Sequence, residues 1–154
     1  MLRFIYVIIM NLFRAPYIIP KMRKWADHPE KYSEEERYKL VRHVIYLMKR
    51  SGKIKTVAYG EENLPKEGGY VMYPNHQGKY DALGIISTHK EPCSLVMDEA
   101  KSHTILVSEF VDLLQGKRLI KDNVRQALKI ITEVSEDVKK GKKVCLFGDV
   151  RSFT

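Results

Sequence analysis

Two long segments of the chain carry apolar residues at helical spacing. In the first, from about residue 34 to 50, these residues recur three or four positions apart: Leu40, Val41, Val44, Ile45, Leu47 and Met48. Ser33-Glu34-Glu35-Glu36 has the pattern of a capping box, and Gly52 is expected to end the helix as its C-terminal cap. His43 falls among the apolar positions, so we expect it to pack against its neighbours rather than to bind a ligand.

The second segment lies near the end of the chain. Its apolar residues are four, three, three and four positions apart: Val124, Leu128, Ile131, Val134 and Val138. Asp122 is expected to cap its start, with Lys139 and Lys140 in the last turn and Gly141 beyond it. This spacing predicts a long amphipathic helix.

Short apolar runs between these helices predict strands, at residues 54–59, 70–73, 93–97, 118–120 and 143–147. A turn-rich stretch from Gly60 to Gly69 joins the first two, which we expect to be neighbours. Further helices are expected with Asp81 in the first turn and over about 102–115. The alternation predicts one α/β domain over 1–154, a mixed sheet flanked by helices, with N-terminal helices in 1–50 and the α/β core in 51–154.

The first 25 residues combine apolar, aromatic and basic side chains. The apolar run at 4–10 is far shorter than the roughly 20 residues of a spanning helix, and no small-x-small cleavage site comes after it. Pro16 and Pro20 are expected to interrupt the residues beyond this run. The aromatic and basic residues suit a headgroup boundary, which predicts a helical, membrane-associating segment: Phe4, Tyr6, Phe13, Tyr17 and Trp25 with Arg3, Arg14, Lys21, Arg23 and Lys24. The alternative is a helix packed on its own domain.

Composition and charge narrow the range of partners. The hydrophobic content of 44% argues against disorder, and 27 Lys and Arg against 19 Asp and Glu give a net charge of +8. This charge favours phosphate-bearing metabolites, nucleic acid or an acidic membrane, and alone it does not choose among them. Cys93 and Cys145 lie in apolar runs, so we expect buried thiols in an intracellular, reducing compartment. The histidines lack metal-ligand spacing, and we expect no metal site.

The candidate chemistry lies after the strand at 70–73. That strand stops at Pro74, and the chain then carries His76 and, five residues later, Asp81. An extended chain would hold the two roughly 17 Å apart, and a helix would point them about 140° away from each other. They can pair only if the backbone reverses between them, and Gly78 supplies freedom for such a reversal. A His paired with an Asp in a loop beyond a strand makes a general base.

The pattern Asn75-His76-x-x-x-x-Asp81 resembles the NHxxxxD signature of glycerolipid acyltransferases, the family that contains 1-acyl-sn-glycerol-3-phosphate acyltransferase. The stretch from Tyr59 to Pro65 looks like the family's lead-in, and Gly116 to Asp122 falls where its second, basic motif belongs. The resemblance covers roughly residues 54 to 150.

This resemblance implies a direct acyl transfer. His76 would take the proton from the free hydroxyl of a lysophospholipid such as lysophosphatidate, and the hydroxyl would attack an acyl thioester of coenzyme A or acyl carrier protein. Asp81 would fix the tautomer of His76 and raise its basicity, and Asn75 would contribute to the substrate site by shaping the turn. No bound cofactor is expected. The absence of a Gly-x-Ser-x-Gly elbow also favours direct transfer over a covalent acyl-enzyme.

The resemblance also implies a phosphate-binding residue in the second motif. Where the family has Arg after an apolar run, this chain has Lys121-Asp122, so the candidates are Arg118, Lys121 and Arg125. Arg binds phosphate with a bidentate fork and Lys as a point charge. For each residue the alternative is a solvated basic edge beside a helix cap.

The chain departs from the family after Phe147. The third motif, Phe-Pro-Glu-Gly, should come after the last strand, yet the chain continues as Gly148-Asp149-Val150-Arg151-Ser152-Phe153-Thr154. We therefore expect a truncated or frame-shifted acyltransferase of phospholipid synthesis, peripheral on the cytoplasmic face of the cell membrane. The alternative is an inactive acyltransferase-like fragment that only binds anionic membranes. Nucleic-acid binding rests on charge alone and lacks a motif.

Overall fold

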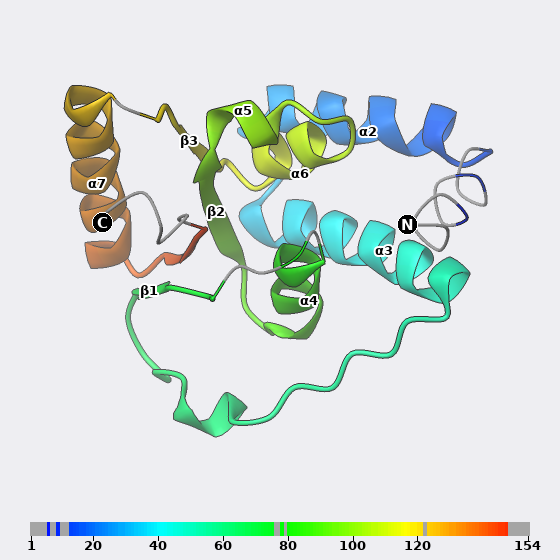
Figure 1. Ribbon diagram of the computed structural model, residues 1–154, viewed down its shortest axis with the longest axis horizontal. Coiled ribbons are helices and arrows are strands. Elements are labelled where there is room, and N and C mark those ends of the chain that lie inside the picture. The colour runs from blue at the N-terminus through cyan, green and yellow to red at the C-terminus, as the bar shows by residue number, and fades with distance from the viewer. Residues whose placement is uncertain are drawn as a thin grey trace.

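The computed structural model describes residues 6, 9, 13–75, 78, 80–121 and 123–147 (Figure 1). His76, Asp122, the segment 148–154 and most of the first 12 residues lie outside this range. The elements in chain order are α2 (Ala15–Asp27), α3 (Glu34–Gly52), the 3-10 helix η1 (Glu61–Asn63), β1 (Tyr70–Met72), α4 (Asp81–Thr88), β2 (Cys93–Asp98), α5 (Glu99–Ser102), α6 (Val107–Leu113), β3 (Lys117–Leu119), α7 (Val124–Lys139) and β4 (Lys143–Leu146).

The four strands form one sheet in the order β1-β4-β2-β3. Every pairing among the described residues is parallel, with Val71 opposite Val144, Leu95 opposite Cys145 and Met97 opposite Arg118. The expected α/β fold is confirmed, but the sheet is parallel instead of mixed. Because all strands run the same way, their carboxyl ends share one edge, and the loops after these strands meet there.

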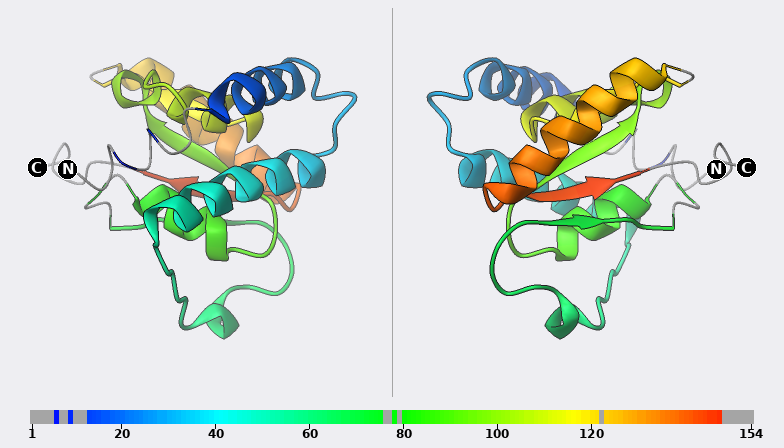
Figure 2. Two further views of the ribbon diagram at one scale, coloured as in Figure 1. Left: turned by 90° about the vertical axis from the view of Figure 1, so that its right-hand side faces the viewer. Right: turned by 90° about the vertical axis from the view of Figure 1, so that its left-hand side faces the viewer.

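Helices cover the two faces of the sheet unequally (Figures 1 and 2). One face packs against α2, α3, α4 and α6 in a core that includes Met22, Ile45, Ile86 and Leu113. Among the described elements, only α7 packs against the other face, through a smaller cluster that includes Val96, Ile130 and Val134.

The capping box at the start of α3 is present. Glu36 N donates to Ser33 Oγ over 3.2 Å, and Ser33 N donates to Glu36 Oε2 over 2.8 Å. The expected end at Gly52 is wrong by one residue, because Gly52 is still helical and Lys53 takes the left-handed cap conformation at φ 50°. His43 is exposed, so it does not pack in the core.

The first described helix, α2, shows that the prolines do not break the segment. Pro16 sits in the first turn, where its missing N–H needs no partner, and Pro20 lies inside the helix. Met22 is fully buried, so this part of the segment packs on its own domain. No helix in the described ranges is long and apolar enough to cross a bilayer.

The expected strand at 54–59 is wrong. The residues run without strand pairing, and Ile54, Val57 and Tyr59 are exposed. Alternating side chains favour a strand, but a strand also needs a neighbouring strand to pair with. This segment runs into η1 and does not pair with β1.

Two expected helices also differ in detail. The helix expected over about 102–115 is shorter than predicted: α5 ends at Ser102, and α6 begins only at Val107, after Leu106 with its positive φ of 75°. Helix α7 is present, and Asn123 caps it by accepting from Gln126 N over 3.0 Å. The expected cap, Asp122, lies outside the described residues.

Candidate active site

A tight turn joins β1 to α4 at the carboxyl edge of the sheet. After Met72 the chain passes Tyr73, Pro74 and the exposed Asn75, and it enters α4 at Asp81. The Gly78 amide donates to Asp81 Oδ2 over 2.7 Å, and the Asp81 amide donates to the Gly78 carbonyl over 3.2 Å. These two bonds make a hydrogen-bonded turn that leads into α4. His76, Gln77 and Lys79 lie outside the described residues.

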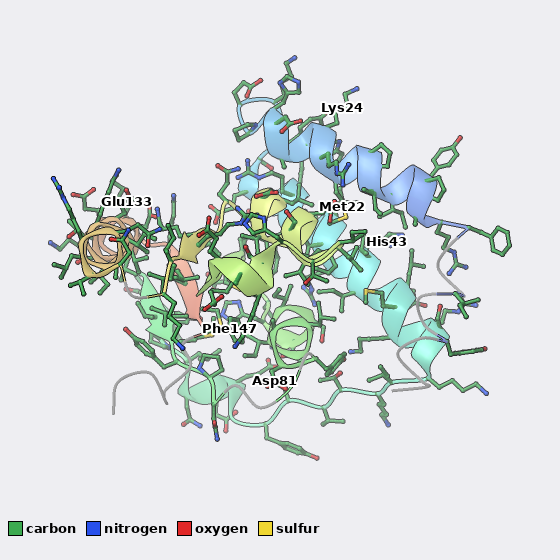
Figure 3. The ribbon with its side chains drawn as sticks, turned by 45° about the horizontal axis from the view of Figure 1, so that its top comes forward. Met22, Lys24, His43, Asp81, Glu133 and Phe147 are labelled. Carbon is green, nitrogen blue, oxygen red and sulfur yellow. The ribbon has the colours of Figure 1, made fainter. Side chains whose placement is uncertain are left out.

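Local chemistry explains why Asp81 sits where it does. It is the first residue of α4, where the positive end of the helix dipole favours a carboxylate. Figure 3 shows Asp81 at the start of this helix. The preceding residue, Tyr80, hydrogen-bonds through its hydroxyl to Thr56 Oγ1 over 2.5 Å. This bond fastens the 54–60 segment, which is not part of the sheet, to the start of α4.

The described residues of the two motifs follow the two outer strands of the sheet. Asn75 and Asp81 come after β1, and Lys121 comes after β3, with β4 and β2 between these two strands. At about 4.8 Å per strand, the ends of β1 and β3 are roughly 14 Å apart. Both groups lie at the carboxyl edge because the sheet is parallel, although 40 residues separate Asp81 from Lys121 in the sequence.

Arg118 is held inside the domain by three side chains. It donates to Ser102 Oγ over 2.9 Å and to Ser108 Oγ over 3.3 Å, and its Nη2 pairs with Asp112 Oδ1 at 2.7 Å. These bonds direct its guanidinium toward α5 and α6. A phosphate would have to compete with Asp112 for this residue.

Lys121 and Arg125 differ from Arg118 in being exposed. Lys121 lies in the turn after β3, and Arg125 is in the first turn of α7. The first turn of a long helix favours anions, because its free N–H groups and dipole present positive charge. The three candidate cations therefore separate into one half-buried, paired residue and two exposed residues.

Sequence reasoning missed a buried histidine beside β1. His89 is only 6% exposed, and its Nδ1 lies 2.6 Å from the Glu91 carbonyl oxygen. Because that carbonyl can only accept, Nδ1 carries the proton, and Nε2 accepts from the Tyr70 hydroxyl over 2.7 Å. Burial raises the pKa of Tyr70. The partners are 19 residues apart and carry no motif, so no local signal indicated the pair.

The same pair lines a cavity of about 610 Å³ under the 58–66 segment. Its walls include the apolar side chains of Leu64, Pro65, Met72 and Ile85. Met72 is the last residue of β1, and Ile85 lies one helical turn after Asp81. The cavity therefore lies next to the candidate site.

A second cavity, of about 680 Å³, lies between α2, α6 and β3. Its polar centre is Glu109, only 3% exposed, which accepts from Arg23 Nη2 over 2.6 Å and from the Leu106 amide over 2.6 Å. Burial opposes ionisation of Glu109, but these hydrogen bonds outweigh it and lower the pKa of the carboxyl group.

Neither cysteine is suited to nucleophilic attack. Cys93 and Cys145 are buried and free, as the sequence predicted. Burial raises the pKa of the Cys93 thiol to about 11, and it also raises that of Cys145. At neutral pH both stay protonated, and a thiol reacts as its thiolate. Within the described ranges, His, Cys, Asp and Glu form no group of three or more that could hold a metal ion.

Comparison with known families places the sheet and the turn in one matched region. Residues 55–149 match the family model described as Acyltransferase, which is more than half of the chain. The match includes all four strands, Asp81 and Lys121, while α2 and α3 lie before it. No match was found among curated proteins or among solved structures.

Proposed function

This chain belongs to the acyltransferase family, and we propose that it transfers a fatty acyl group to the free hydroxyl of lysophosphatidate in phospholipid synthesis. The donor would be the acyl thioester of coenzyme A or of acyl carrier protein. The product would be an ester together with the free thiol. The single observation that carries this proposal is the turn from Gly78 to Asp81 at the carboxyl edge of the sheet.

In the proposed reaction, His76 accepts the proton of the acceptor hydroxyl as the oxygen attacks the thioester carbonyl. The tetrahedral intermediate then collapses with cleavage of the carbon–sulfur bond, and the imidazolium returns the proton to the leaving thiolate. No group remains on the protein, so the chemistry needs one base and no nucleophilic side chain. The protonated thiols of Cys93 and Cys145 agree with this scheme.

Asp81 would stabilise the positive charge that develops on His76. The turn from Gly78 to Asp81 supports this role, because the two side chains can pair only if the chain turns between them. A carboxylate beside an imidazole favours the charged form and fixes which nitrogen carries the proton. We assign Asn75, next to the base, to shaping the turn that faces the substrate.

For the acceptor phosphate we propose Lys121 and Arg125. Both are exposed at the carboxyl edge, whereas Arg118 is occupied by Asp112 and two serines. The ends of β1 and β3 are roughly 14 Å apart, so long cationic side chains are needed to reach a head group held at the base.

We further propose that the protein works at the cytoplasmic surface of a membrane, attached peripherally through its N-terminal segment. Four large hydrophobic residues near the N-terminus are exposed, and together we call them the N-terminal stripe: Tyr6, Ile9, Phe13 and Tyr17. Phe13 is 91% exposed and Tyr17 is 88% exposed, with the basic Lys21 and Lys24 further along α2. Aromatic and basic residues in this combination suit anionic headgroups. By contrast, Trp25 stacks on Tyr32 with ring centroids 4.3 Å apart and belongs to the domain.

This stripe also supports the second candidate function, anionic membrane binding without catalysis. The two candidates separate in one assay, thiol release from acyl-CoA and from acyl carrier protein, each with lysophosphatidate present. We expect thiol release by the wild type and its loss in His76→Ala. His43→Ala, in an exposed histidine of α3, is the matched control and should keep full activity.

If the wild type releases no thiol from either donor, the proposed acyltransferase activity is refuted and anionic membrane binding remains as the candidate function. Equal activity of His76→Ala and His43→Ala would refute the assigned base. Membrane attachment is judged separately, by flotation with anionic vesicles of the wild type and of a Phe13→Glu, Tyr17→Glu double variant.

A further inference from the structure

Helix α7 exposes a row of apolar side chains. Val124 is 72% exposed, Leu128 60% and Ile131 56%, and together we call them the α7 stripe. They are four and three residues apart, so they lie along one side of the helix. Figure 1 shows α7 at the margin of the molecule, with the sheet on one side and no described element on the other.

The α7 stripe is not the side by which the helix packs. Ile130 and Val134 are buried against the sheet, and Ile131 lies about 100° further around the helix than Ile130. The apolar face of α7 is therefore wider than its contact with the sheet. Packing uses one part of that face and leaves the stripe uncovered by the described residues.

The charges around the α7 stripe are basic. From Asn123 to Thr132 the sequence contains Arg125 and Lys129 and no acidic residue. The first acid within the helix, Glu133, accepts from Lys117 on β3 over 3.0 Å. Apolar side chains beside cations match the chemistry of an anionic lipid surface, where chains take up the apolar groups and headgroups pair with the charges.

The position of the α7 stripe links it to the site. Helix α7 begins after the carboxyl end of β3, so Val124 and Leu128 lie toward the edge of the sheet that also carries Asp81. We propose that the α7 stripe, with Arg125 and Lys129, is a second docking surface for an anionic bilayer, and that it turns the carboxyl edge toward the lipid. The orientation rests on the proposed function, because only then must the edge meet an acceptor in the bilayer.

Flotation of the full chain with vesicles tests the docking surface. The vesicles contain equal parts phosphatidylcholine and phosphatidylglycerol. Leu128→Glu is expected to lower the partition coefficient about tenfold or more, since it removes an inserted Leu and adds a charge repelled by the lipid. Val57→Glu makes a similar change at an apolar residue that is 55% exposed and lies outside α7, in the 54–60 segment. This control variant should bind within about twofold of wild type.

A second pair of variants tests the charges. Lys129→Glu is expected to reduce binding several-fold at low salt. Lys140→Glu makes the same charge change at the far end of α7 and should reduce it less. Binding to vesicles of phosphatidylcholine alone should be weak for all four variants.

Three results would overturn the docking surface: wild type that does not float, equal binding of Leu128→Glu and Val57→Glu, or a wild-type dimer in solution that Leu128→Glu converts to monomer. The last result would make the α7 stripe a contact between copies of this chain. Thiol release with a short-chain, water-soluble acceptor reports the proposed reaction separately, because it needs no bilayer. If the protein releases no thiol in this assay but its flotation still depends on Leu128, the proposed function is refuted and the docking surface is supported.

Discussion

Asp81 gives the sharpest test of the proposed site, because loss of its charge should have a small effect on stability and a large effect on catalysis. Its carboxylate accepts one short hydrogen bond from the Gly78 amide at 2.7 Å and sits at the positive end of α4. Asp81→Asn keeps an oxygen that can accept this bond and removes only the charge. We expect it to lower the free energy of unfolding by about 1 kcal/mol, from the loss of the charge–dipole interaction and a weaker bond.

The effect on catalysis should be much larger. In the proposed reaction the carboxylate stabilises the imidazolium, so its loss is expected to slow acyl transfer by about 100-fold to 10,000-fold. That range corresponds to roughly 3–5 kcal/mol of transition-state stabilisation. A domain stable by about 5–15 kcal/mol stays almost entirely folded after a loss of 1 kcal/mol. Unfolding therefore cannot produce the expected fall in rate.

The assay combines thiol release under saturating donor with urea unfolding of the same samples. Asp81→Ala serves as the comparison, because it removes the hydrogen bond as well as the charge and should cost about 2–3 kcal/mol of stability. If Asp81 acts on His76, both variants lose activity to a similar extent although their stabilities differ. If activity instead tracks stability, with Asp81→Asn within fivefold of wild type, the catalytic role is refuted and Asp81 only forms the turn.

Three further predictions concern the domain that carries the site. Glu109→Gln should lower the free energy of unfolding by about 1–2 kcal/mol above pH 4.5. Because the pKa of Glu109 is lowered in the folded protein, the difference between variant and wild type should vanish as the pH falls through that pKa. A difference in urea unfolding that stays constant from pH 7 to 3 would refute this prediction. Arg37 is buried with Nε and Nη1 lacking partners among the described residues, so Arg37→Met should raise the unfolding free energy by about 1 kcal/mol, and a fall of that size would contradict it. A methyl group at Gly69 would collide with the carbonyl oxygens of Val138 and Lys142, so Gly69→Ala should cost at least about 2 kcal/mol by thermal unfolding, whereas Gly84→Ala, with room inside α4, should be neutral or stabilising.

Much of the fold was predictable because its signals are local. The capping box at Ser33 and Glu36 acts over three residues, and the structure confirms it. The strands at 70–73, 93–97, 118–120 and 143–147 correspond to β1, β2, β3 and β4, since a buried parallel strand reads as a short apolar run. The turn before Asp81 was also predictable, because Pro74 ends a strand and Asp81 favours the start of a helix.

Partners distant in the sequence decided the rest. The 54–59 segment alternates as a strand does, but no sheet edge pairs with it. The sequence named Arg118, Lys121 and Arg125 as phosphate candidates without distinguishing them, and only the structure shows Asp112 and two serines around the Arg118 guanidinium. The Tyr70 and His89 pair had no signal at all.

The same division holds for chemistry and for surfaces. By itself the sequence determined the candidate base, its carboxylate and the amphipathic character of α7, because residue type and spacing carry that information. Only the tertiary structure decided which cations face solvent at the carboxyl edge and which part of the apolar face of α7 is buried. Burial and pairing depend on what another segment presents, and a pattern along one segment does not contain its partner.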